Sequence, residues 1–85
     1  MENEKFKAWR NRNPLRAWRR ESGFFQSMVA AGVGATAQTV RDWESGSSMP
    51  SPNNMATLAH IMSVDVQTLA DEWSAWVDEA RVNIS

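Results

Sequence analysis

The residues best suited to specific hydrogen bonding lie in one short stretch, residues 37–45. Glutamine can bond adenine through two hydrogen bonds, arginine can bond guanine in the same way, and aspartate can accept from the amino group of cytosine. If the stretch is a helix, Val40 and Trp43 share its apolar face. The polar face then consists of Gln38, Thr39, Arg41 and Asp42. The stretch therefore has the side chains that are needed to read base edges in the major groove of DNA.

A second short helix is predicted just before this stretch. Residues 26–33 place small and apolar side chains on one face, and Gly34 suits the left-handed end of a helix. Thr36 is a suitable N-cap for the helix over residues 37–45. Two short helices, a glycine turn and a polar second helix are typical of the DNA-binding helix-turn-helix. A helical hairpin in an ordinary small bundle has the same pattern, so this stretch alone leaves both interpretations open.

The composition excludes most catalytic and metal chemistry. The chain has no cysteine, no tyrosine and a single histidine, His60, which lies off the apolar stripe of its helix and is expected to face solvent. No nucleophile–base pair and no cluster of metal ligands stands out. The glycines at Gly32 and Gly34 follow no strand, so they indicate a turn and helix packing rather than a phosphate loop. We therefore expect no enzymatic activity, no metal and no cofactor.

The net charge of −1 does not suggest a nucleic-acid partner, but the distribution of charge does. Residues 1–20 contain seven lysines and arginines and two glutamates, a net charge of +5. Residues 60–85 contain one arginine and five acidic residues, a net charge of −4. A protein with a basic end and an acidic end can bind a polyanion by one face. The alternative is a surface dipole of solvated charges.

The remaining elements complete a small all-α domain. Asn13-Pro14 predicts a helix over residues 14–22 that Gly23 ends, with Arg16 on its exposed face. Ser51-Pro52 starts another helix, and Asp65 caps the last one. Eighty-five residues are enough for one domain with its own core. No apolar run is long enough to span a membrane and no signal-peptide core precedes the helices, so the expected compartment is the cytoplasm.

Two segments leave alternatives open. Residues 1–13 form either a basic arm or a short helix that turns Phe6 and Trp9 toward the domain, or else a frayed terminus. Phe25 stands where a capping residue is expected, so the helix at 26 is weakly held or the ring rests on the N-terminal segment. On the last helix, part of the apolar stripe is a self-association face, a seat for the N-terminal aromatics or simply core. This part consists of Trp76, Val77 and Ala80.

Several features from Asn13 to Trp73 occur together at characteristic spacings. They are the segment NPLRAWRRESG, Gln26, Trp43-Glu44 seventeen residues later, Ser45-Gly46, Pro50-Ser51-Pro52, Leu58-Ala59 and Val64-Asp65-Val66. With these features the chain resembles the Xre family, the helix-turn-helix domains of phage Cro and repressor proteins. The resemblance implies a five-helix, lambda-repressor-like bundle that binds operator DNA as a two-fold dimer. The domain would span residues 14–73, followed by a C-terminal helix extension over 74–85.

The resemblance also assigns roles to residues by position. Base edges would be contacted by Ala37, Gln38, Arg41 and Asp42. The DNA backbone would be contacted by Gln26, Thr36, Thr39 and Ser47, and by Lys5, Lys7, Arg10 and Arg12 of the N-terminal segment. Arg19 and Glu44 would form a partly buried ion pair that fixes geometry. The resulting prediction is a small phage or mobile-element repressor that acts by occupying its operator.

This sequence departs from the family pattern at three places. Ala37 stands where several phage repressors carry a long polar side chain, so a base contact is lost or becomes a methyl contact to thymine. Gly32 replaces a usual apolar residue. The loop of Gly46 to Met49 contains no lysine or arginine, which leaves the phosphate contacts to the N-terminal segment. The weak net charge and this uncharged loop motivate a second hypothesis: a protein-interaction module on the same scaffold, antitoxin-like or an anti-repressor, that binds a protein partner through the tryptophan-rich C-terminal helix.

Overall fold

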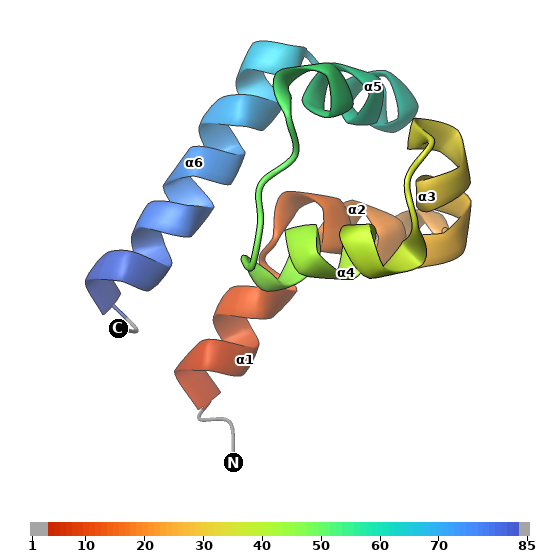
Figure 1. Cartoon of the computed structure of the whole chain (residues 1–85). Coiled ribbons are helices and arrows are strands. Elements are labelled where there is room, and N and C mark those ends of the chain that lie inside the picture. Colours follow the sequence, from red (N-terminus) through yellow and green to blue (C-terminus); the bar gives the residue numbers. More distant parts are fainter. Residues whose placement is uncertain (1–3, 84–85) are drawn as a thin grey trace.

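The computed structural model describes residues 4–83, which form six α-helices and no strand (Figure 1). The helices are α1 (Glu4–Asn11), α2 (Pro14–Ser22), α3 (Gln26–Val33), α4 (Ala37–Ser45), α5 (Pro52–Met62) and α6 (Val66–Asn83). The predicted all-α class is confirmed, with five helices from Pro14 onward and α1 in front of them. Residues 1–3 and 84–85, parts of the predicted N-terminal segment and C-terminal extension, lie outside the described residues.

Helices α2, α4 and α5 begin where their capping residues predict. Asn13 Oδ1 accepts from the amide of Arg16 at 2.9 Å, and Thr36 Oγ1 accepts from the amide of Thr39 at 3.1 Å. Ser51 starts α5 in the same way. Each of these bonds satisfies an amide that the first turn of a helix leaves without a partner. Left-handed glycines end α2, α3 and α4.

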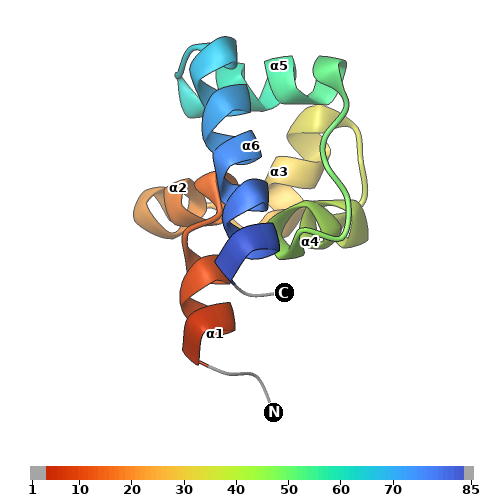
Figure 2. The ribbon, with the colours of Figure 1, turned by 90° about the vertical axis from the view of Figure 1, so that its left-hand side faces the viewer.

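The core lies between the five helices that follow Pro14. Figures 1 and 2 show α2, α3 and α4 on one side, with α5 crossing above them and α6 running down beside them. The side chains that fill the interior come from every one of these helices. The fully buried apolar ones are Leu15, Val29, Val40, Leu58, Leu69 and Trp73. Val40 and Trp43 are buried together, so the apolar face predicted for α4 is directed inward.

Helix α1 is fastened to α6 by two tryptophans, a contact that we call the Trp9–Trp76 clasp. Their rings stack with centroids 4.1 Å apart and planes 2° from parallel. Trp9 Nε1–H donates to the carbonyl of Trp76 at 2.6 Å, and Trp76 Nε1–H donates to the carbonyl of Trp9 at 2.7 Å. Each indole therefore keeps a hydrogen-bond partner although both rings are buried. Of the alternatives for this part of the last helix, Trp76 is a seat for Trp9, while Val77 and Ala80 are only partly buried.

Gly46 lies at the point where α4 ends and the clasp begins. Its φ of +83° is the left-handed conformation that glycine adopts at low cost. A Cβ atom at this position would lie 2.8 Å from Trp9 Cη2, closer than side chains can approach. The glycine thus has two functions, because it ends α4 and it leaves room for the indole of Trp9.

Gly32 also has a packing role. A Cβ on this residue would lie 3.0 Å from Cδ1 of Ile61 on α5. A methyl group at this position would therefore require the flexible end of the Ile61 side chain to move by a few tenths of an ångström.

We predict that Gly46→Ala is more destabilising than Gly34→Ala. Both positions have positive φ, so each substitution should cost roughly 1–2 kcal/mol of unfolding free energy through backbone strain. Only at Gly46 does the new methyl group also collide with Trp9, because nothing lies within 4 Å of a Cβ at Gly34. Urea unfolding measures the difference, and near-ultraviolet circular dichroism reports whether the indole stack is lost. Equal losses in the two variants, with the stack retained, would contradict the packing role.

Candidate nucleic-acid interface

The outer face of α4 carries a connected row of polar side chains. Arg41 Nη2 donates to Gln38 Oε1 at 2.9 Å, and Gln38 Nε2 donates to Asp42 Oδ1 at 3.0 Å. Gln38 and Arg41 are exposed, and Asp42 is half-buried. The bonds hold the three side chains side by side along the helix. The row presents donors and acceptors together, which is the combination required by base edges in a major groove.

The start of α4 presents small groups. The hydroxyls of Thr36 and Thr39 lie 3.0 Å apart, and Thr36 is exposed. Ala37 is half-buried between them and offers only a methyl group. At the other end of the helix, the amide of Ser47 donates to the carbonyl of Asp42 at 2.9 Å, and the Ser47 hydroxyl lies 2.9 Å from that of Ser45.

A buried ion pair holds α4 against α2. Arg19 Nε and Nη2 each bond one carboxylate oxygen of Glu44, at 2.6 and 2.8 Å. The side chains are 13% and 2% exposed, so water hardly competes with this contact. Hydrogen bonding to Glu44 raises the pKa of Arg19, and the opposite charge of Glu44 acts in the same direction. This is the pair that the family resemblance implied between the first helix of the domain and its recognition helix.

Two further groups complete the network around this pair. Arg19 Nη1 also donates to the carbonyl of Phe24 at 3.0 Å, and Gln26 Nε2 donates to Glu44 Oε1 at 3.1 Å. The network thereby joins α2, α3 and α4. Gln26, which the resemblance assigns to a phosphate, is half-buried at the edge of the network. Its amide is held in position by Glu44.

We predict that Arg19→Met destabilises the protein by about 3–5 kcal/mol, because it leaves Glu44 charged, buried and without its partner. The double variant Arg19→Met/Glu44→Met should recover much of that loss, since it removes both charges and fills the site with apolar atoms. Denaturant unfolding of both variants provides the measurement. A single variant that loses less than the double variant would show that the pair does not hold α4.

Three arginines from three helices converge beside α4. Arg10 of α1, Arg16 of α2 and Arg41 of α4 line one recess of about 170 Å³. The guanidinium of Arg10 lies 5.5 Å from the centroid of the Phe6 ring, a cation–π contact. The sequence indicated Arg10 and Arg41 but not Arg16, which was only expected to be exposed. Its convergence with the other two depends on how α2 sits against α4.

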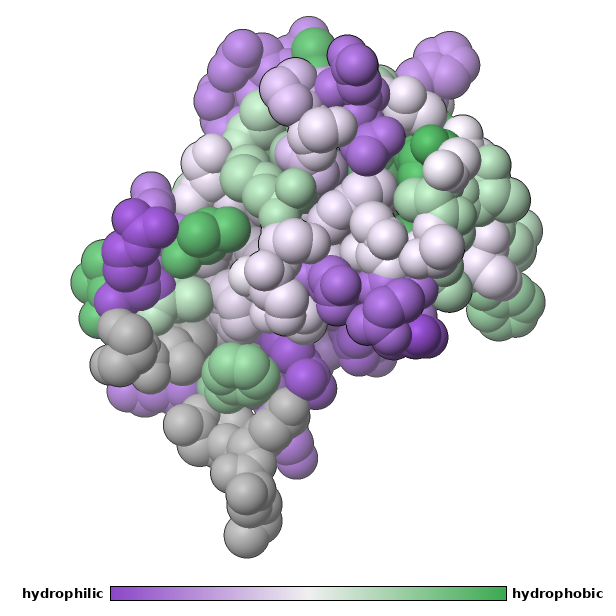
Figure 3. Space-filling view, in the orientation of Figure 1, coloured by the Kyte–Doolittle hydropathy of each residue, from purple (hydrophilic) through white to green (hydrophobic). Residues whose placement is uncertain are grey.

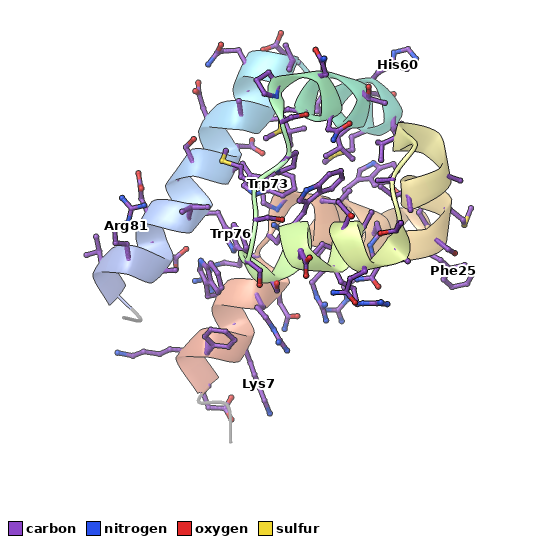
Figure 4. The ribbon with its side chains drawn as sticks, in the orientation of Figure 1. Lys7, Phe25, His60, Trp73, Trp76 and Arg81 are labelled. Atoms are coloured by element: carbon purple, nitrogen blue, oxygen red, sulfur yellow. The ribbon has the colours of Figure 1, made fainter. Side chains whose placement is uncertain are left out.

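The four basic residues predicted to contact DNA from the N-terminal segment have different surroundings. Lys5 and Lys7 are exposed on α1, and Figure 4 shows Lys7 extending on the side of α1 that lies below α4. Arg10 lies in the recess described above. Arg12 instead forms an ion pair with Glu79 of α6, so its charge is compensated within the chain. Helix α1 is thus the short helix among the alternatives, and Arg10 is the residue that places a positive charge of this segment in the recess beside α4.

Phe25 does not rest against the N-terminal segment. Its side chain is 69% exposed and makes no capping hydrogen bond, while its amide donates to the sulfur of Met28 at 3.4 Å. The space-filling view shows hydrophilic side chains gathered over α4, with hydrophobic colour beside them where α3 begins (Figure 3). An apolar ring therefore stands at the border of the polar face.

Other kinds of site find no support in the described part of the chain. Between residues 4 and 83 no three His, Asp or Glu side chains are grouped to hold a metal ion. His60 is exposed on α5 (Figure 4). None of the helices in the described range is long and apolar enough to cross a membrane.

The short helices α3 and α4, the glycine turn between them and the polar outer face of α4 define a helix-turn-helix domain. A family model described as helix-turn-helix matches residues 15–69, more than half of the chain. The chain belongs to this family, which is of the Xre and Cro type. Comparison with curated proteins and with solved structures gave no significant match. Membership supports a DNA-binding transcription regulator of the Xre type, a family of regulators and not of enzymes.

Proposed function

We propose that the protein is a repressor that binds a specific operator and acts by occupying it. The observation that carries the proposal is the hydrogen-bonded row of Gln38, Arg41 and Asp42 on the outer face of α4. The row is backed by the buried ion pair of Arg19 with Glu44 and flanked by further arginines. Base edges would be read by this row, and phosphates would be bound by the cations and hydroxyls around it. The scaffold type is common in phages and mobile elements, where we place this protein.

The operator would be bound by two copies of the chain related by a two-fold axis. Half-sites then lie about one helical turn of DNA apart. Because Trp76 is covered by Trp9, the contact between copies needs another apolar surface. A recess of about 380 Å³ with exposed Met49 and Val66 at its rim lies just after the end of α4. Contact there would fix the spacing of the two α4 helices, because few residues separate the recess from Ser45.

Selection of bound sites from random duplexes, followed by sizing of the complex, tests this function directly. We expect a pseudo-palindromic site and two chains per duplex. Arg41→Ala should then weaken binding by roughly 1–3 kcal/mol and relax the preference at one base pair. Arg81→Ala, which removes the same charge from the far end of α6, should leave the preference unchanged. Equal binding of the protein to every duplex would rule out sequence-specific binding to an operator.

The salt dependence of binding tests the role of α1. If Lys7 neutralises one phosphate, Lys7→Gln should reduce the slope of log K against log salt by about 0.9 and weaken all sequences alike. Arg81→Gln is the matched control, because it changes the net charge equally on the outer side of α6, away from Lys7 (Figure 4). Identical slopes for Lys7→Gln and the unmodified protein would place Lys7 outside the interface.

A protein-interaction module, antitoxin-like or an anti-repressor, is the second candidate. It is favoured by the apolar recess beside Met49 and by the loop after α4, in which Ser47 and Ser48 offer no charge to a phosphate. Pull-down of a partner protein, with no retention on heparin or on duplex columns, would select this function over the first.

A further inference from the structure

The exposed ring of Phe25 is not explained by folding. Phenylalanine cannot accept the hydrogen bond that Ser, Thr, Asp or Asn offers at an N-cap, and such a loss costs about 0.5–2 kcal/mol. Burial does not offset this cost, since 69% of the residue remains exposed. In Figure 4 the ring projects away from the body of the protein at the start of α3. A residue that breaks a local rule without a folding benefit is a candidate for a binding role.

The surroundings of the ring indicate which partner it contacts. An open recess lies between the start of α3 and the start of α4. Ala37 forms part of its wall and offers a methyl group there instead of a long side chain. Phe25 and Ala37 are the two apolar residues of a wall that is otherwise polar or cationic. The lining includes Phe25, Gln26, Ser27, Ala37, Arg16 and Arg41.

On the major-groove edges of DNA, the 5-methyl group of thymine is the apolar feature. We propose that Phe25 is a specificity-determining residue that packs against the methyl group of a thymine, beside the bases contacted by Gln38 and Arg41. This inference rests on the proposed function and deepens it, because it names one feature of the operator. The ring substitutes for the long side chain that Ala37 lacks, but it reaches the groove from α3.

The charges around the ring favour DNA over a protein partner. Arg16 and Arg41 line the same recess as Phe25. A protein that covered the ring with apolar groups would desolvate these guanidinium groups without compensation, which is costly. A duplex brings phosphates to the arginines and a methyl group to the ring at the same time.

The test uses duplexes in which each thymine of the selected half-site is replaced in turn by deoxyuridine, which lacks only the methyl group. For the unmodified protein we expect one position at which this replacement weakens binding roughly fourfold, the value of one buried methyl group. Phe25→Ser should abolish the effect at that position while raising the melting temperature, since serine restores the N-cap. Phe25→Leu should retain part of the effect, because its side chain remains apolar.

Ala37→Ser is the control for the neighbouring methyl group. If Phe25 makes the contact, the deoxyuridine effect persists in Ala37→Ser and disappears in Phe25→Ser. The reverse result would assign the methyl contact to Ala37 and overturn the proposal. The proposal would also be overturned if the protein bound a specific operator in which no position is sensitive to deoxyuridine, although the repressor function would then stand. Equal binding to all duplexes would contradict both the Phe25 contact and the repressor function. If Phe25→Ser leaves DNA binding unchanged and instead disrupts association with a protein, the ring is a protein contact.

Discussion

The buried contact between Arg19 and Glu44 determines what the outer face of α4 can do. The two side chains are held by paired hydrogen bonds, and Phe24 and Gln26 occupy further positions around them. Val40 and Trp43 fix the rotation of α4 about its own axis, and the ion pair fixes the helix relative to α2. Because the rotation of α4 and its position relative to α2 are both fixed, the side chains of Gln38, Arg41 and Asp42 are held on the outer face. The buried contacts of α4 therefore determine which polar groups its outer face presents, as expected of a site built on rigid elements.

The Trp9–Trp76 clasp adds a second constraint, and Gly46 connects it to the first. The same residue that ends α4 receives the edge of the Trp9 ring. Helix α1 is thereby placed by the end of α4 as well as by α6, and Arg10 is carried into the recess beside Arg41. The basic charge of the N-terminal segment is in this way positioned relative to the polar row. Arg12 is the exception, because Glu79 lies within its reach.

Local signals were sufficient to predict helices α2 to α6, but they decided neither the conformation of α1 nor the contacts between distant segments. Asn13, Thr36 and Ser51 each accept from the amide three residues later, so their effect can be deduced from the sequence alone. The pairing of Trp9 with Trp76 joins residues 67 positions apart, and apolar spacing left it as one of several alternatives. The convergence of three arginines was missed for the same reason, since it depends on the angle between helices. Phe25 was recognised as anomalous, yet only the structure shows that it lines the same recess as Ala37.

The length of α1 gives the clasp a consequence for dynamics. Eight residues are too few for an isolated helix, which in water is marginal below about 12–15 residues, so α1 is helical only while docked. We therefore expect that opening the clasp melts the helix and releases the segment in one cooperative step, while the core contacts among α2 to α6 that do not involve Trp9 remain. We expect α1 to behave as a separate foldon, whose amides exchange with solvent at lower free energy than those of the core. Each opening would also withdraw Arg10 from the recess that it shares with Arg41, so in the proposed DNA complex the measured affinity would include the equilibrium of this local unfolding.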